Sequence, residues 1–117
     1  MMLFQWLKRF CAENQPPVVH VPDGPRTPPV RRRYHFSGTV QGVGFRYEAA
    51  MLAGQLDLVG WARNENDGTV IIEIEGEARC IDEFLRAMRA VRRFDITEIQ
   101  TEELPVSGTE TTFQALY

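Results

Sequence analysis

A glycine-rich segment, Gly38-Thr39-Val40-Gln41-Gly42-Val43-Gly44-Phe45-Arg46, contains the residues of this sequence best suited to bind an anion. Glycine lacks a Cβ atom and adopts positive φ readily, so several backbone N–H groups of such a loop can point toward one position. If a helix begins near Phe45, that position lies at the positive end of the helix dipole. Arg46 would add a planar group of donors that matches the oxygens of a phosphoryl group. The segment therefore predicts a phosphate-binding loop, formed by Gln41, Gly42, Val43, Gly44 and Phe45.

The glycine spacing by itself also fits an ordinary strand-to-helix turn with an arginine on the surface. The loop lacks the Gly-Lys-Ser/Thr of a Walker loop, and its glycines do not match the Gly-x-Gly-x-x-Gly pattern of dinucleotide-binding proteins. Phosphatases with a thiolate nucleophile carry a cysteine six residues before their loop arginine, whereas this sequence has Val40 six residues before Arg46. We therefore do not expect a covalent cysteinyl-phosphate intermediate.

A second motif reads Gly60-Trp61-Ala62-Arg63-Asn64-Glu65-Asn66-Asp67-Gly68-Thr69-Val70. Together with Val40–Arg46 it closely resembles the acylphosphatases, and the resemblance extends over residues 31–117. It implies a small αβ sandwich that hydrolyses carboxyl-phosphate anhydrides without a metal or another cofactor. In that family the motif arginine binds the phosphate and the motif asparagine positions the attacking water. The resemblance therefore implies these catalytic roles for Arg46 and Asn64.

The substrate that this resemblance implies needs little help with its leaving group. A carboxylate whose conjugate acid has a pKa of about 4 departs without being protonated. The protein then has to hold the phosphoryl oxygens, compensate the charge that develops in the transition state and place a water in line. The loop N–H groups and Arg46 suit the first two tasks. The side chain of Asn64 has both an acceptor and a donor, so it can orient a water without ionising.

The residues of the second motif also have structural interpretations. Asn64 could cap the turn at Asp67-Gly68, as many asparagines at strand ends do. We expect Asp67 to serve that turn, Trp61 to lie in the core and Arg63 to be exposed. Two positions depart from the family pattern, since Asp57 stands where glycine commonly ends the first helix and Ala62 stands where valine is usual. Both departures affect a helix cap or packing rather than the chemistry.

The composition excludes several other classes of protein. A chain of 117 residues with a net charge of −3 suits one domain and argues against general nucleic-acid binding. We also expect no transmembrane segment, because no apolar run reaches about 18 residues. Cys11, Cys80, His20 and His35 predict neither a disulfide framework nor a metal site. The arginines of two clusters are expected to be solvated, namely Arg31, Arg32 and Arg33 before a strand and Arg86, Arg89, Arg92 and Arg93 near a helix end.

The N-terminal residues 1–30 are expected to be an accessory tail to a domain formed by residues 31–117. Six of the seven prolines lie between Pro16 and Pro29, which predicts an extended linker rather than a strand or a helix. Before the linker, apolar residues recur with the spacing of a short amphipathic helix. They are Leu3, Phe4, Trp6, Leu7 and Phe10. This segment could contact a partner or a membrane surface, or it could be an accessory tail or the result of a wrongly chosen start codon.

Periodicity predicts the elements of the domain. Alternation of apolar residues indicates strands over 33–40, 58–64, 69–75, 94–104 and 111–117, and apolar residues with a period of 3.6 indicate helices from Phe45 to Leu56 and from Glu77 to Val91. The residues Glu65-Asn66-Asp67-Gly68 suit a hairpin turn. Because two helices on such connections cover one face of a sheet, the order predicts an α+β, ferredoxin-like βαββαβ sandwich with a mixed or antiparallel sheet.

The sequence thus favours a monomeric, cytoplasmic acylphosphatase that acts on a small-molecule acyl phosphate and needs no cofactor. Two alternatives stay open at this point. One is an anion-binding module on the same fold that does not turn over a substrate. The other is an accessory domain that acts on carbamoyl phosphate, as in carbamoyltransferase maturation factors. A domain that binds nucleic acid through its sheet face is less well supported, because Phe36, Trp61 and Phe113 suit the core.

Overall fold

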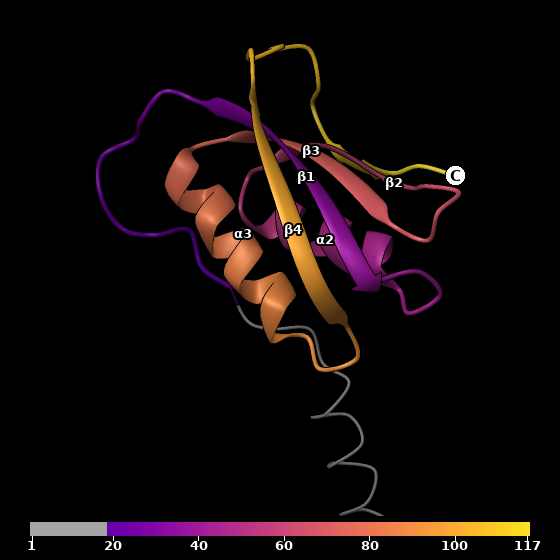
Figure 1. The fold of residues 1–117 in the computed structure, drawn as a ribbon. Helices are drawn as coiled ribbons and strands as arrows, with labels where there is room; N and C mark the ends of the chain where they lie inside the picture. The colour runs from indigo at the N-terminus through magenta and orange to yellow at the C-terminus, as the bar shows by residue number, and fades with distance from the viewer. Residues whose placement is uncertain (1–18) are drawn as a thin grey trace, which may run out of the picture.

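The computed structural model describes residues 19–117, which form a five-stranded sheet with two helices packed on it (Figure 1). The amphipathic segment predicted before Cys11 lies outside the described residues. In chain order the elements are β1 (Val30–Thr39), α2 (Phe45–Gln55), β2 (Val59–Asn64), β3 (Val70–Gly76), α3 (Ala78–Ala90), β4 (Asp95–Leu104) and β5 (Phe113–Ala115). In the described part of the chain, no helix has both the length and the apolar character that crossing a membrane requires.

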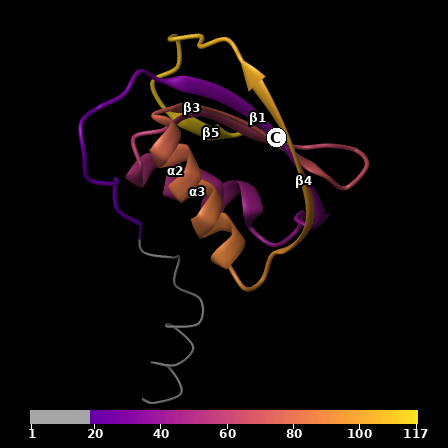
Figure 2. The same cartoon turned by 60° about the vertical axis from the view of Figure 1, so that its left-hand side comes forward.

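The strand order in the sheet is β4-β1-β3-β2-β5. The pairs β1–β3, β1–β4 and β2–β3 are antiparallel, and only β5 runs parallel to its neighbour β2. Both helices lie on the same face of the sheet, as Figure 2 shows. This arrangement confirms the predicted ferredoxin-like α+β sandwich. Strand β4, whose alternate residues are polar, lies at one edge of the sheet.

The core lies between the sheet and the helices. All five apolar residues of the first predicted helix stripe are buried, namely Phe45, Ala49, Leu52, Ala53 and Leu56. The strands contribute Phe36, Val70 and Ile72, which are fully buried. Cys80 of α3 lies in the same core, and burial raises the pKa of its thiol. Cys80 therefore behaves as a small buried hydrophobic residue.

The opposite face of the sheet is covered by charged side chains, which corrects two predictions. Arg31 is only 6% exposed, because it forms ion pairs with Glu73, Glu75 and Glu110. The prediction of a solvated arginine was therefore wrong for this residue. Trp61 is half-buried on this face, with the Arg63 guanidinium 5.0 Å from its ring centre, rather than in the core. Its cross-strand partner is Glu73, so the alternation of the sheet places Trp61 away from the helices.

Helix α2 ends in a conformation that glycine normally adopts. Asp57 has φ 55°, and the N–H of Leu58 donates to the carbonyl of Ala53 at 2.9 Å. A hydrogen bond that runs back five residues from the residue after a left-handed one is typical of the Schellman motif. Asp57, which stands where the family commonly has glycine, therefore occupies a backbone conformation that disfavours a side chain.

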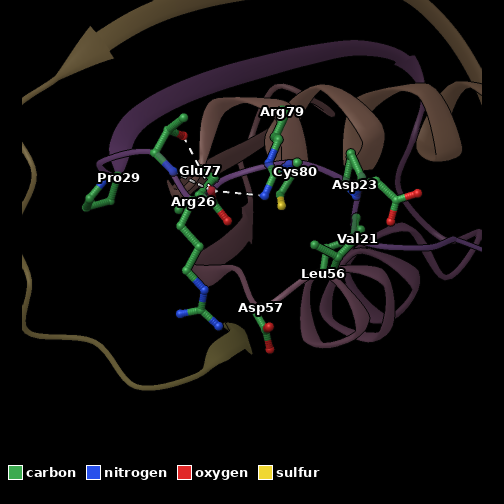
Figure 3. Close-up of a pocket in the computed structure, with 13 residues that line it drawn as sticks. Val21, Asp23, Arg26, Pro29, Leu56, Asp57, Glu77, Arg79 and Cys80 are labelled. Carbon is green, nitrogen blue, oxygen red and sulfur yellow. Dashed lines mark hydrogen bonds and ion pairs between the residues drawn. The ribbon is translucent and has the colours of Figure 1, made fainter.

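From residue 19 onward, the proline-rich linker forms neither helix nor strand, as predicted, but it packs against the domain. Val19 is 7% exposed in the core, and the N–H of Thr27 donates to Glu77 Oε1 at 2.7 Å. The linker lines one side of a cavity of about 470 Å³, open to solvent, between the end of α2 and the start of α3 (Figure 3). Arg26 and Asp57 lie at this cavity, which is at the end of α2 away from the glycine-rich loop.

Candidate active site

The glycine-rich loop connects β1 to α2 and has the backbone conformation that the sequence predicted. Gly42 has φ 75° and Gly44 has φ 78°, and a Cβ atom at Gly42 would meet no atom within 4 Å. No side chain caps the start of α2. Among residues 19–117, the backbone N–H groups from Gly42 to Tyr47 have no hydrogen-bond partner, and the first bond of the helix joins Glu48 N to Gly44 O at 3.0 Å. The loop thus presents unpaired donors at the positive end of the helix dipole.

Gln41 holds this loop against the hairpin between β2 and β3. Its side-chain Nε2 donates to the carbonyl of Glu65 at 2.7 Å and to the carbonyl of Thr69 at 2.8 Å. These two residues also close the hairpin turn, since Glu65 N donates to Thr69 O at 2.8 Å. The side chain of Gln41 therefore links the loop to the second motif and leaves only its backbone to face an anion.

Arg46 lies in the first turn of α2 and is half-buried. Its Nη1 donates to the carbonyl of Leu116, and its guanidinium lies 5.3 Å from the ring centre of Tyr117. Leu116 is held in turn by β2, because its N–H donates to Ala62 O at 2.8 Å. The short parallel strand β5 thus brings the C-terminal residues to the first turn of α2. The remaining donors of the Arg46 guanidinium have no partner among residues 19–117.

Asn64 lies at the end of β2 on the face of the sheet that the helices cover. Asn64 is the cross-strand partner of Val70 on β3, and Val70 is in turn the cross-strand partner of Phe36 on β1. The ring of Phe45, the first residue of α2, lies 5.0 Å from that of Phe36. The row from Asn64 to Phe36 therefore runs beneath the start of α2, and this arrangement brings Asn64 to the same end of the domain as Arg46.

The turn after β2 does not use the Asn64 side chain. Asp67 Oδ1 accepts hydrogen bonds from Thr69 N at 3.1 Å and from Thr69 Oγ1 at 2.5 Å. These bonds lower the pKa of Asp67, and they confirm that it serves the turn. Asn64 is half-buried, and its side chain has no hydrogen-bond partner among the described residues. Its donor and acceptor are therefore available to a ligand or a water.

Arg93 is exposed, as predicted for its arginine cluster, but it also contacts the glycine-rich loop, which the sequence did not indicate. Its Nε donates to the carbonyl of Val43 at 2.7 Å, and its Nη2 donates to Glu48 Oε1 at 3.2 Å. Sequence reasoning also missed the contact of Leu116 and Tyr117 with Arg46. Each of these contacts joins residues at least 45 positions apart, so no local pattern in the sequence indicates them.

The arrangement suits a tetrahedral anion with three acceptor oxygens. The loop offers backbone donors, Arg46 offers a charged donor, and Asn64 offers a group that can hold a water. Among residues 19–117, no three His, Cys, Asp or Glu side chains are grouped as a metal site would require. The donors at the loop also suit an anion far better than they suit a metal ion, since nearly all of them are N–H groups.

Comparisons with known proteins agree on one family. The family model described as Acylphosphatase matches residues 32–115. An acylphosphatase of Clostridium acetobutylicum is 40% identical over 81 residues, which cover 68% of this chain and 89% of that protein. An acylphosphatase of Oceanobacillus iheyensis is 37% identical over 87 residues, covering 73% of this chain and 96% of that one.

Solved structures show the same relationship. The crystal structure of an acylphosphatase from Bacillus subtilis has a TM-score of 0.70 at 32% identity, and the match covers 75% of this chain and 99% of that one. Full-length HypF, solved in a phosphate- and nucleotide-bound form, has a TM-score of 0.68 at 30% identity. That match covers 79% of this chain but only 12% of HypF, so it concerns one part of a much longer protein.

Proposed function

Because this chain belongs to the acylphosphatase family and is an acyl phosphate hydrolase, we propose that Arg46 and the loop hold the phosphoryl group while Asn64 orients the attacking water. One observation supports this assignment above the others. The backbone N–H groups from Gly42 to Tyr47 are unpaired among residues 19–117, and Arg46 lies in the same helical turn. Unpaired N–H groups at a helix start are suited to bind an anion.

The proposed reaction is a direct in-line attack by water on phosphorus. The new bond forms between the water oxygen and phosphorus, the bond from phosphorus to the acyl oxygen breaks, and the attacking water gives up one proton to the solvent. The leaving carboxylate takes the bonding electron pair and needs no proton, because it is a weak base whose conjugate acid has a pKa of about 4. The loop and Arg46 compensate charge on the phosphoryl oxygens, which is how proteins commonly accelerate phosphoryl transfer. The reaction in this form needs no metal and no covalent intermediate.

Asn64 suits the placement of water because its side chain has both kinds of hydrogen-bonding atom. The carbonyl oxygen can accept a proton of the water, and the amide can donate to the phosphoryl group or to a second water. The use of Asp67 in the turn supports this role, since the turn does not require Asn64. An amide does not ionise near neutral pH, so it orients the water but does not act as a general base.

Hydrolysis of acetyl phosphate by the purified protein tests the proposal. We expect phosphate release at the same rate with and without EDTA, and competitive inhibition by inorganic phosphate. Loss of activity in EDTA that a divalent cation restores would overturn the metal-free mechanism. Binding of phosphate without hydrolysis of acetyl phosphate, benzoyl phosphate or carbamoyl phosphate would instead support the anion-binding module.

The curated relatives favour a free enzyme over an accessory domain, because the chain covers 89% and 96% of two proteins that carry the acylphosphatase name. We further propose that the protein is a monomer that acts in the cytoplasm on a small-molecule acyl phosphate. Light scattering on the purified full chain tests the oligomeric state. Fractionation of the source cells tests the location.

A further inference from the structure

Arg93 joins three parts of the molecule that are far apart in the sequence. It lies between α3 and β4, and its Nε donates to the Val43 carbonyl in the glycine-rich loop at 2.7 Å. Its Nη2 donates to Oε1 of Glu48, in the first turn of α2, at 3.2 Å. The Glu48 side chain is 4% exposed and that of Arg93 is 39% exposed. One guanidinium therefore holds the loop and the start of the helix in a fixed relation.

We propose that Arg93 is a positioning residue that sets the direction of the Val43–Gly44 peptide, so that the Gly44 N–H faces the bound phosphoryl group. This inference rests on the function proposed above for the loop. In a trans peptide the carbonyl and the following N–H point in opposite directions, and the described chain has no cis peptide. Because the Val43 carbonyl points to Arg93, the Gly44 N–H points away from it.

The loop needs such a restraint because its glycines permit the opposite arrangement. Rotation of the Val43–Gly44 peptide changes ψ of Val43 and φ of Gly44, and glycine accepts either sign of φ. The rotated peptide would direct the negative end of its dipole, the carbonyl oxygen, toward the anion. A Cβ atom at Gly44 would lie 3.5 Å from Arg93 Nη2, which shows how closely the guanidinium approaches this peptide. Arg93 favours the arrangement that presents a donor.

A different account would give Arg93 only the task of neutralising Glu48. A buried carboxylate beside an anion site disfavours anion binding unless a cation compensates it. The two accounts differ in what happens when the carboxylate is removed as well. If Arg93 acts only on Glu48, the double variant Glu48→Gln with Arg93→Gln binds phosphate normally. If Arg93 acts on the loop carbonyl, the double variant still binds phosphate weakly.

The experiment measures the dissociation constant of inorganic phosphate and kcat/KM for acetyl phosphate in the full-length protein. We expect Arg93→Gln to weaken phosphate binding about tenfold and to lower kcat/KM by a similar factor, as the loss of a charge-assisted hydrogen bond predicts. Arg92→Gln is the matched control, because it removes the same charge from the adjacent, exposed position. Its phosphate affinity should stay within about twofold of the wild type.

The amide signal of Gly44 in a ¹H–¹⁵N NMR spectrum provides a readout that a general loss of stability does not change. Phosphate should shift this signal downfield in the wild type and in Arg92→Gln, and should shift it much less in Arg93→Gln and in the double variant. Wild-type affinity in either Arg93 variant, or an unchanged shift of Gly44, would overturn the positioning role. An inactive wild type that binds no phosphate would contradict the proposed function itself, whereas unaffected Arg93 variants of an active enzyme contradict only this inference.

Discussion

The guanidinium of Arg46 lies 5.3 Å from the ring centre of Tyr117, a residue 71 positions later in the chain. The same guanidinium donates to the carbonyl of Leu116, which β2 holds through Ala62. Arg46 therefore does not move freely in solvent, since two neighbours restrain it before any substrate binds. Such restraint reduces the entropy that an arginine loses when it binds a phosphoryl group.

The first prediction concerns the charged donor beside the loop. Arg46→Ala should lower kcat/KM for acetyl phosphate by about 10²-fold or more, which corresponds to about 3 kcal/mol, and should also weaken inhibition by inorganic phosphate. Arg46→Lys should restore little, because an ammonium group lacks the planar set of donors. Steady-state kinetics with phosphate as the inhibitor measures both effects. A folded Arg46→Ala protein with normal phosphate inhibition would remove Arg46 from the site.

Asn64 should affect turnover without affecting phosphate affinity. Asn64→Ala removes the group proposed to hold the water, so kcat should fall by about 10²-fold or more while the inhibition constant of phosphate stays nearly unchanged. Asp67→Asn is the matched comparison, because Asp67 accepts the hydrogen bonds of the same turn. Asp67→Asn should lower the free energy of unfolding and leave kcat nearly unchanged. Full activity of Asn64→Ala would leave Asn64 with a structural role only.

Asp57 offers a test of the backbone at the end of α2. Its φ of 55° disfavours any residue with a Cβ atom, so Asp57→Gly should raise the free energy of unfolding by about 0.5–1 kcal/mol. Asp57→Ala removes the same charge but keeps a Cβ atom, and it should not stabilise the protein. Urea denaturation of the two variants measures the difference. Activity should stay unchanged in both, because Asp57 lies at the end of α2 away from the loop.

Buried glutamates on the open face of the sheet should make stability depend on pH. Burial raises the pKa of Glu75, but hydrogen bonds from the backbone N–H groups of Ser107 and Gly108 and from Arg31 outweigh burial, so its pKa is lowered from the usual 4.5. A pKa that is lower in the folded state contributes stability above about 4.5, and this contribution is lost as the pH falls through the folded value.

Glu75→Gln measures that contribution. The variant should lower the free energy of unfolding by about 1–2 kcal/mol at pH 7, and its difference from the wild type should shrink as the pH is lowered below 4.5. Glu98→Gln, at an exposed position of the edge strand β4, is the control and should change stability little at either pH. A difference between wild type and Glu75→Gln that is independent of pH would show that ionisation of Glu75 does not stabilise the fold.

The linker should matter for stability rather than for chemistry. A truncated chain that begins at Val30 should keep kcat/KM within about twofold, because every proposed site residue follows Val30. It should lose about 1–2 kcal/mol of stability, since Val19 leaves the core and the bond from Thr27 to Glu77 is removed. Val19→Ala in the full chain should account for part of that loss. A well-folded but inactive truncated protein would give the linker a part in the site.

Sequence alone predicted the features that depend on neighbouring residues. The alternation around Tyr34 and Phe36 and the apolar stripe from Phe45 to Leu56 follow from the fixed periods of strands and helices. The positive φ of Gly42 and Gly44 follows from residue type, because glycine alone adopts it at little cost. The order of these elements was sufficient to predict the sandwich, since short connections permit few arrangements of two helices and one sheet.

Tertiary structure decided which distant side chains meet. Arg92 and Arg93 have the same type and adjacent positions, yet only Arg93 reaches the loop carbonyl of Val43. Arg31 is buried because three glutamates surround it, and Trp61 is half-buried because the face of β2 that carries it is not covered by a helix. A charged or aromatic side chain can be buried or exposed to solvent, depending on the partners that surround it. The packing of remote segments supplies those partners, and a local sequence pattern does not contain that information.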